Sequence, residues 1–217
     1  AATIPLNKVR LLAPIIPRSK VVCVGKNYAD HAAEMGGVVP EEPIIFLKPN
    51  TSVIGPNDTI VWPEMSERVD HEAELAIVIG RICKDVPKER VNDVIFGYTI
   101  ANDVTARDLQ KKDGQWTRAK GFDTFCPIGP WIDTDFVPGT QKITATIAGE
   151  VKQSAQISDM IFDVPTIINF VSRVMTLLPG DVILTGTPAG IGPMVAGEKA
   201  TMAIEGLGEL TNKLSAR

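Results

Sequence analysis

Two carboxylates begin an apolar stretch that has the character of a β-strand, Glu72–Ile79. Glu72 and Glu74 are two residues apart, and residues at this spacing project from the same face of a strand. Adjacent buried anions repel each other and lose hydration unless a cation lies between them. The spacing therefore indicates a cation site, and it leaves open a second interpretation in which both side chains sit at a hydrated strand end.

A third carboxylate, Asp103, follows the next candidate strand, Ile95–Ala101. Three oxygen donors without Cys or His suit a hard cation, so the pattern favours Mg²⁺ or Mn²⁺, with Ca²⁺ as a further possibility. An Asp at a strand end can also cap the helix that follows it. The metal interpretation predicts that Glu72, Glu74 and Asp103 are the ligands.

An imidazole and a carboxylate, His31 and Glu34, are three residues apart in the candidate helix Tyr28–Met35. On a helix this spacing puts both on one face, where Glu34 can orient the ring and raise its basicity. Such a pair can serve as a general base that activates water. The alternative is a surface ion pair of little consequence.

Several cationic and polar side chains are candidates for binding an anion. Lys48 ends the candidate strand Ile44–Leu47, and we expect it at a rim where it could meet an anionic ligand or an oxyanion. Arg107 and Gln110 would share a helix face near the metal, and Lys120 precedes a glycine. Each could instead be a solvated surface residue.

A glycine-rich segment, Leu184–Pro193, could present backbone N–H groups to an anion. It lacks the helix that a dinucleotide-binding loop requires, and the phosphate-loop, GxSxG and HExxH patterns are absent from the sequence. We therefore expect no organic cofactor and neither serine-hydrolase nor zinc-protease chemistry.

The elements that must position these residues are short and separated by many Gly and Pro residues. The sequence predicts strands at Lys20–Val24, Ile44–Leu47, Glu72–Ile79, Ile95–Ala101, Ile143–Ala148, Val182–Leu184 and Thr201–Ile204. It predicts helices or helical turns at Tyr28–Met35, Lys88–Val94, Thr105–Lys111 and Pro165–Thr176, the last capped by Asp163. Strands and helices do not alternate regularly, so a mixed, strongly curved α+β fold is expected rather than a doubly wound sheet.

Composition narrows the class of protein. The 217 residues are expected to form one catalytic domain, residues 1–217. A net charge of −4 without a Lys/Arg run argues against nucleic acid as a partner, and no apolar run is long enough for a membrane span. Without a signal peptide or a disulfide or zinc spacing, Cys23, Cys83 and Cys126 are expected to be reduced thiols of a cytoplasmic protein.

Seven segments together resemble the fumarylacetoacetate hydrolase family, in order from about Val9 to Asn212. These segments are GKNYADHAAEM, PIIFLKPN, VDHEAELAIVIG, NDVTARDLQ, QWTRAKGFDTFCPIGPW, SDMIF and MTLLPGDVILTGTPAGIGP. The resemblance implies a mixed β-roll, a homodimer and a divalent metal. Many bacterial relatives carry a small N-terminal domain before the segment similar to LNKVRLLAPI, and we expect that domain to be absent from this chain.

The resemblance also implies roles for individual residues. Glu72, Glu74 and Asp103 match the family's metal ligands, while His31 and Glu34 match a water-activating pair on a lid and Lys120 matches a catalytic lysine beside the metal. Residues that match substrate-side positions are Tyr28, Lys48, Arg107, Gln110, Gly186 and Thr187. The lid stretch 35–42 contains no Arg or Lys, so it offers no evident clamp for a second substrate carboxylate.

The reaction implied is cleavage of a carbon–carbon bond in a small 2-oxo acid. A metal that chelates the 2-oxo acid stabilises the enolate formed when the bond breaks. Hydrolysis of an acylpyruvate such as fumarylpyruvate or acetylpyruvate to pyruvate is the first expectation. The alternatives are decarboxylation of oxaloacetate, isomerisation of 2-hydroxyhepta-2,4-diene-1,7-dioate, and a non-enzymatic protein that binds a small anion with a stabilising metal.

Overall fold

The computed structural model describes residues 3–34, 36 and 38–216, and its largest element is a mixed seven-stranded sheet. The strand order is β2-β1-β12-β6-β7-β9-β3, in which β1 pairs with β12 and β3 with β9 in parallel while the other pairs are antiparallel. The strands are β1 (Val21–Gly25), β2 (Ile44–Lys48), β3 (Val53–Ile54), β6 (Ala73–Ile79), β7 (Ile95–Asn102), β9 (Cys126–Asp133) and β12 (Val182–Leu184).

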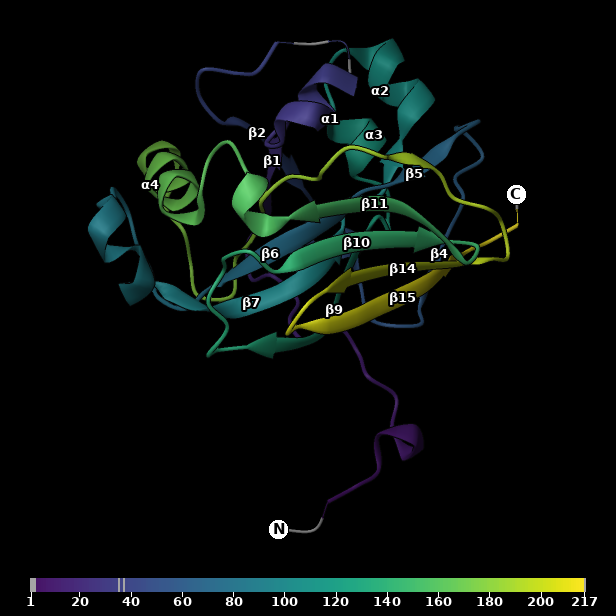
Figure 1. Cartoon of the computed structure of the whole chain (residues 1–217), viewed down its shortest axis with the longest axis horizontal. Coiled ribbons are helices and arrows are strands. Elements are labelled where there is room, and N and C mark those ends of the chain that lie inside the picture. Colours follow the sequence, from purple (N-terminus) through teal and green to yellow (C-terminus); the bar gives the residue numbers. More distant parts are fainter. Residues whose placement is uncertain (1–2, 35, 37, 217) are drawn as a thin grey trace.

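A five-stranded sheet packs across the first one, in front of β6 and β7 as drawn in Figure 1. Its order is β11-β10-β14-β15-β4, formed by β4 (Thr59–Ile60), β10 (Lys142–Ile147), β11 (Glu150–Gln156), β14 (Lys199–Ile204) and β15 (Gly208–Leu214). A small sheet of order β13-β5-β8 contains β5 (Val69–His71), β8 (Thr105–Ala106) and β13 (Gly192–Pro193). The curled, mixed β architecture predicted from the sequence is confirmed.

The central strand β6 is buried on both faces, which explains its unbroken apolar run after Glu74. Leu75, Ile77 and Ile79 project into the main core, which β10 and β14 of the second sheet also line. Ala76 and Val78 project into a smaller apolar cluster on the other face. This alternation places the Glu74 side chain on the same face of β6 as Ala76 and Val78.

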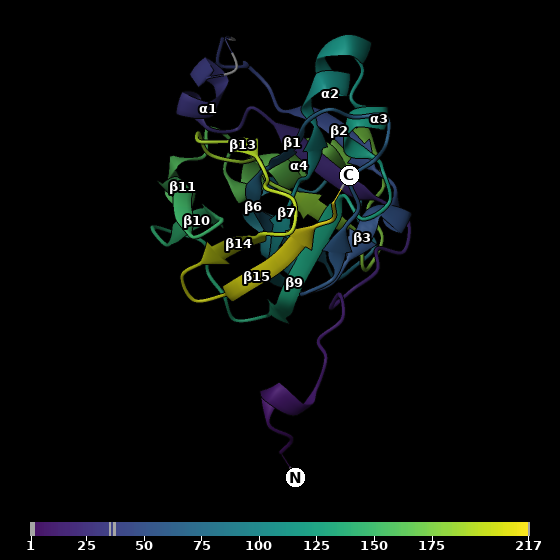
Figure 2. The same cartoon turned by 90° about the vertical axis from the view of Figure 1, so that its right-hand side faces the viewer.

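Three short helices lie together at one end of the molecule in both Figure 1 and Figure 2. They are α1 (Ala29–Glu34), α2 (Arg107–Asp113) and α3 (Thr117–Lys120). The longer helix α4 (Val164–Val174) begins as predicted, because the Asp163 carboxylate accepts a hydrogen bond of 2.9 Å from the Thr166 N–H. The 3₁₀ turns are η1 (Leu6–Lys8), η2 (Asn50–Ser52), η3 (Lys88–Asp93) and η4 (Ile157–Asp159).

Most predicted elements differ from the structure by one or two residues at their ends, and for two of them the structure shows the reason. The strand predicted over Glu72–Ile79 is interrupted at Glu72, whose backbone N–H donates to the side-chain Oδ1 of Asn102 at 3.0 Å instead of to a backbone carbonyl. The helix predicted from Thr105 begins only at Arg107, because the two preceding residues pair with β5. Met35, the last residue of the predicted helix Tyr28–Met35, lies outside the described residues.

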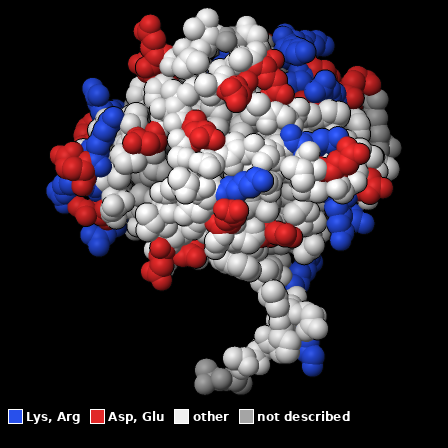
Figure 3. Space-filling view, viewed as in Figure 1, with Lys and Arg blue, Asp and Glu red and all other residues white. Residues whose placement is uncertain are grey.

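The first residues described extend away from the body at the end opposite to α1, α2 and α3 (Figures 1 and 2). Among the residues that the structure describes, no helix has the length and apolar character needed to span a membrane. On the face shown in Figure 3, acidic and basic side chains are interspersed. The end that carries the short helices is therefore free of the N-terminal segment.

Candidate metal centre

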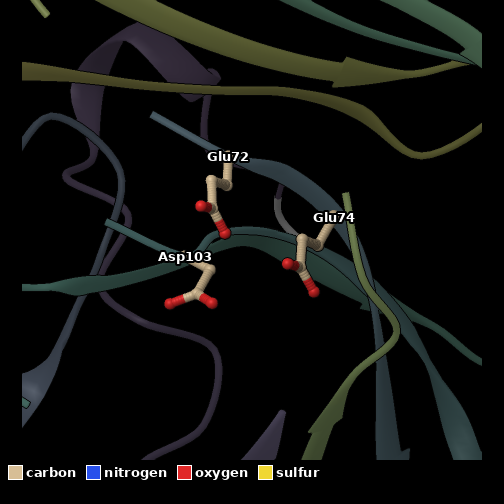
Figure 4. Close-up of side chains that lie close together, drawn as sticks. All are labelled: Glu72, Glu74 and Asp103. Carbon is tan, nitrogen blue, oxygen red and sulfur yellow. The ribbon is translucent and has the colours of Figure 1, made fainter. Parts of the chain in front are cut away.

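Three carboxylates converge where β6 and β7 meet (Figure 4). Glu72, Glu74 and Asp103 each offer an oxygen, and these oxygens lie within 4.8 Å of one another. The register of β6 and β7 pairs Ala73 with Asn102, so Glu72 comes opposite Asp103, whose N–H donates to the Glu72 carbonyl at 2.9 Å. All three side chains are buried, which rules out a hydrated strand end.

The helix-cap interpretation of Asp103 is also excluded. Helix α2 begins at Arg107, its N-cap residue is Ala106, and none of the described side chains caps it. Asp103 therefore faces the other two carboxylates and not the helix N-terminus.

Three cationic side chains surround the carboxylates. The Lys120 ammonium bridges Glu72 at 2.8 Å and Asp103 at 2.7 Å. The Lys48 ammonium donates to Asp103 at 2.5 Å, and the Arg107 guanidinium donates to Glu72 at 2.5 Å. Glu72 and Asp103 are thus each paired with two cations.

Glu74 differs because its carboxylate accepts only one hydrogen bond among the described residues, from the Gly186 N–H at 2.7 Å. Burial raises the pKa of Glu74 well above its usual value, and the carboxylates of Asp103 and Glu72 raise it further. Burial also acts to raise the pKa of Glu72, but the charges of Lys120 and Arg107 outweigh it and hold that pKa well below the ordinary value. The site thus has a deficit of positive charge next to Glu74.

This deficit fits a divalent metal ion. The donors are carboxylate oxygens from three chain positions, with no thiolate or imidazole in the group. Hard cations such as Mg²⁺, Mn²⁺ and Ca²⁺ bind such donors and keep positions open for water or a chelating ligand. Glu72, Glu74 and Asp103 would hold the ion, and its charge would favour the ionised form of Glu74.

The carboxylates open into a pocket of about 170 Å³. Eight of the residues singled out from the sequence line it: His31, Glu72, Glu74, Asp103, Arg107, Gln110, Lys120 and Thr187. They come from chain segments far apart in the sequence, and the helices α1, α2 and α3 supply four of them. The structure therefore brings the predicted base, cations and carboxylates to one cavity.

The predicted His31–Glu34 pair is formed within α1. The His31 Nδ1 lies 3.3 Å from the Glu34 carboxylate, and the imidazole is buried. The Glu34 side chain is about 34% exposed and also accepts from the Gly190 N–H at 3.2 Å, which ties the helix to the glycine-rich segment. This leaves the Nε2 of His31 available to a ligand.

Three predicted substrate-side residues do not line the pocket. Lys48 was expected at a rim, but it is buried beneath Asp103 and also donates to the Val104 carbonyl at 3.1 Å. Gly186 supports Glu74, and its φ of +98° explains why glycine stands there. Tyr28 is buried, and its hydroxyl has no hydrogen-bond partner among the described residues.

Six residues that line the pocket were not predicted: Val24, Gly25, Lys26, Phe46, Lys111 and Trp116. Phe46 and Trp116 pack edge to face with ring centroids 5.2 Å apart, and the Lys120 ammonium lies 5.1 Å from the centre of the Phe46 ring. These contacts join segments that are far apart in the sequence, so no local spacing predicts them. Only the position of Lys26, directly after the glycine that ends β1, offered a signal in the sequence.

Comparison with known proteins decides the family. Residues 20–215 match the family model described as "Fumarylacetoacetate (FAA) hydrolase C-terminal". The chain belongs to the fumarylacetoacetate hydrolase family. The resemblance seen in the sequence is thereby confirmed, and the chain is a metal-dependent enzyme of this family that acts on 2-oxo acids.

Three relatives illustrate the range of reactions within the family. The structure of 5-carboxymethyl-2-hydroxymuconate delta-isomerase from Mycobacterium smegmatis is 56% identical, with a TM-score of 0.93 over 100% of this chain and 86% of that one. The mitochondrial oxaloacetate tautomerase FAHD1 of Arabidopsis thaliana is 48% identical over 88% of this chain and 89% of the relative. The structure of fumarylpyruvate hydrolase from Pseudomonas aeruginosa, in complex with Mn²⁺ and pyruvate, is 33% identical, with a TM-score of 0.86 over 96% of this chain and 100% of that one.

Proposed function

We propose that this protein enolises a short 2-oxo dicarboxylate in a reaction that requires Mg²⁺ or Mn²⁺. It would move a proton at C3, the carbon next to the 2-oxo group, and so interconvert keto and enol forms or shift a double bond. The observation that carries the proposal is the presence of the His31 imidazole in the same pocket as Glu72, Glu74 and Asp103. The higher identity to an isomerase and a tautomerase than to a hydrolase supports the choice.

The three carboxylates would hold the ion, and the carboxylate and 2-oxo oxygens of the substrate would complete its coordination. When bound, the ion polarises the 2-oxo carbonyl and makes the C3 protons more acidic. His31 takes a proton from C3 through its Nε2, while Glu34 holds the Nδ1 and stabilises the positive charge that develops on the ring. The imidazolium then gives this proton to the enolate oxygen, which completes the enol, or to the far carbon of the conjugated system, which shifts the double bond. In the reverse direction the same imidazole returns the proton to C3.

Lys120 supports negative charge that develops on the substrate. Burial lowers its pKa, but the neighbouring carboxylates of Asp103 and Glu72 raise the pKa more, so that the ammonium stays protonated. Lys120 lines the pocket next to two of the proposed metal ligands. A fixed cation at that point stabilises an enolate oxygen without reorganisation of solvent.

The charge balance of the site supports a substrate with two carboxylates. Four buried acids, Asp70, Glu72, Glu74 and Asp103, lie among four cations, Arg68, Arg107, Lys48 and Lys120, so these charges sum to zero although none of the four cations pairs with Glu74. A divalent ion adds two positive charges, which a dianion would balance. Lys26 and Lys111 at the pocket have no hydrogen-bond or ion-pair partner within the described part of the chain, so either ammonium can meet the distal carboxylate.

Proton exchange on oxaloacetate tests the proposal directly. With Mg²⁺ or Mn²⁺ in D₂O, the protein should accelerate loss of the C3 proton signal in the NMR spectrum, and chelator should abolish the acceleration. His31→Ala should slow exchange at least about 100-fold, because a positioned general base contributes about 10²–10⁴. Asp103→Asn should remove the metal dependence, while Asp113→Asn on the exposed end of α2 is the matched control. An exchange rate equal to that of buffer with metal would refute the proposal.

Acylpyruvate hydrolysis is the second candidate, and the His31–Glu34 contact favours it because the pair can also activate water. The hydroxide formed would add to the distal carbonyl, the C–C bond would break, and pyruvate and a carboxylic acid would leave. Pyruvate release from acetylpyruvate and fumarylpyruvate, with ¹⁸O from water found in the acid, would establish it. His31→Ala should suppress this hydrolysis more than decarboxylation of oxaloacetate, which needs no activated water. Equal losses on both substrates would contradict that division of roles.

A further inference from the structure

Gln153 is a fully buried polar residue of β11 that contacts the residues on either side of Glu72 and also the glycine-rich segment. Its Oε1 accepts from the Ala73 backbone N–H at 3.0 Å and lies 3.1 Å from the His71 Nδ1. Its Nε2 donates to the Pro188 carbonyl at 2.7 Å and to the Thr187 hydroxyl oxygen at 2.8 Å. One side-chain amide thus joins the residues that flank Glu72 to the glycine-rich segment.

Two backbone groups determine which way this amide points. The Ala73 N–H can only donate and the Pro188 carbonyl can only accept, so the oxygen of Gln153 must face β6 and its nitrogen must face the glycine-rich segment. The assignment therefore does not depend on how the amide atoms are labelled. Since the Gln153 oxygen can only accept, the same reasoning puts a hydrogen on the Nδ1 of His71.

The consequence reaches the pocket through Thr187. The two hydrogens of the Gln153 nitrogen go to the Pro188 carbonyl and to the Thr187 oxygen, so the Thr187 hydroxyl acts as an acceptor toward Gln153. Its own hydrogen must then point elsewhere. Thr187 lines the pocket beside the carboxylates, where an anionic ligand oxygen would accept that hydrogen.

We propose that Gln153 is a positioning residue that turns the Thr187 hydroxyl into a hydrogen-bond donor for the carboxylate of a bound 2-oxo acid. This inference rests on the proposed function, because it assumes that a 2-oxo acid occupies the pocket. Gln153 does not touch the substrate. It acts through Thr187, whose hydrogen it directs toward the ligand.

Binding of pyruvate to the full chain at saturating Mn²⁺, measured by calorimetry, tests the inference with a double-mutant cycle. Gln153→Met and Thr187→Val should each weaken pyruvate binding about tenfold, the effect of one hydrogen bond to a charged group. The double variant should bind no more weakly than Thr187→Val alone, because both changes remove the same hydrogen bond. Thr187→Ser, which keeps the hydroxyl, should recover most of the affinity.

The controls separate a positioning role from a structural one. Gln141→Met removes another amide that bridges two backbone groups, the Gly139 N–H and the Val137 carbonyl, remote from the pocket, and should leave pyruvate affinity unchanged. Mn²⁺ affinity without pyruvate should stay within about twofold in Gln153→Met. Where that variant does not fold, Gln153→Glu replaces it, and its carboxylate should weaken pyruvate binding more than tenfold by accepting the Thr187 hydrogen.

Three outcomes would overturn the inference. Losses that multiply in the double variant would mean that Gln153 acts independently of Thr187, and an equal loss of Mn²⁺ and pyruvate affinity would mean a structural role only. Unchanged pyruvate binding in Gln153→Met or Gln153→Glu would refute the inference while leaving the proposed function intact. A wild-type protein that binds no pyruvate with Mn²⁺ would instead refute the proposed function, and the inference with it.

Discussion

Replacement of Lys48 by Met should reveal how the buried carboxylates are kept stable. The Lys48 ammonium is fully buried, donates to Asp103 at 2.5 Å and has a second acceptor in the Val104 carbonyl. Met has a similar length and no charge, so the variant removes one of two cations that pair with Asp103 and leaves the volume nearly unchanged. The other cation, Lys120, remains.

The expected loss of stability depends on the metal. Removing one partner of a buried ion pair costs about 3–5 kcal/mol, and because the contact with Lys120 remains, the expected loss without metal is about 3 kcal/mol. A divalent ion supplies the missing charge next to Asp103, so the loss should fall to about 1–2 kcal/mol at saturating Mn²⁺. By linkage, a difference of about 1.4 kcal/mol means Mn²⁺ binding that is about tenfold tighter in the variant.

Urea-induced unfolding followed by circular dichroism, in chelator and in excess Mn²⁺, measures both losses, and calorimetry measures Mn²⁺ affinity. Lys84→Met is the control, because the Lys84 ammonium is exposed and donates only to the Arg173 carbonyl among the described residues. It should behave like the wild type under both conditions. Equal destabilisation of Lys48→Met with and without Mn²⁺, or weaker Mn²⁺ binding, would refute the reasoning.

Three further predictions concern the metal, the glycine-rich segment and pH. Mn²⁺ at one hundred times its Kd should raise the free energy of unfolding by about 2.7 kcal/mol, and chelator should reverse this in urea titrations. Gly190→Ala should lower kcat/KM at least tenfold, because its Cβ would lie 2.0 Å from the Lys152 carbonyl oxygen and displace the N–H that binds Glu34. Gly149→Ala is the control, since Gly149 also has a positive φ, +86°, but a Cβ there would have no described atom within 4 Å. Burial acts to raise the pKa of Asp181, but five hydrogen bonds to its carboxylate outweigh burial and lower that pKa. The stability that Asp181 contributes is therefore present above about pH 4 and is lost as the pH falls through the pKa of the folded state. Asp181→Asn should therefore lose about 2–3 kcal/mol at pH 7, and the difference from wild type in urea titrations should shrink toward pH 3.

The metal centre was predictable because its geometry follows from short-range rules. The period of two places Glu72 and Glu74 on one face, and an acid at the end of the next strand is brought alongside when the two strands pair as neighbours. The strands around Ile44–Leu47 and Val182–Leu184 were found for the same reason, since apolar β-branched runs between turn residues form buried strands. Local pattern and tertiary structure agree at these places.

Other strands could not be predicted because their residues do not carry the pattern. β11 reads Glu-Val-Lys-Gln-Ser-Ala-Gln and buries fully only Gln153, so its extended form comes from pairing with β10. β9 contains Pro127 and Pro130, which lower its strand propensity. In β11 the pairing with its hairpin neighbour outweighs local preference, and in β9 the pairing with the more distant strands β3 and β7 does so. The homodimer implied by the family resemblance stays a prediction.

Side-chain partners that lie far apart in the sequence were equally hidden. Lys48 was expected at a rim and not buried, because its partner, Asp103, is 55 positions away and no local spacing connects them. Gln153 gave no signal for a similar reason, since its contacts to Ala73 and Thr187 span 80 and 34 positions. Buried polar residues form hydrogen bonds with partners that the tertiary fold brings close, so these partners depend on the topology and not on local sequence patterns.

The packing of β6 and the assembly of the metal centre have a common cause. Leu75, Ile77 and Ile79 must face the main core, and this assigns Glu74 and the preceding Glu72 to the opposite face. The same register sets Glu72 opposite Asp103, so a slip of one residue would turn the apolar side chains out of the core and separate the carboxylates. Burial of apolar side chains therefore fixes the register that keeps the oxygens of three mutually repelling carboxylates within 4.8 Å of one another. Until a metal ion binds, Lys48, Lys120 and Arg107 offset the negative charge of these carboxylates.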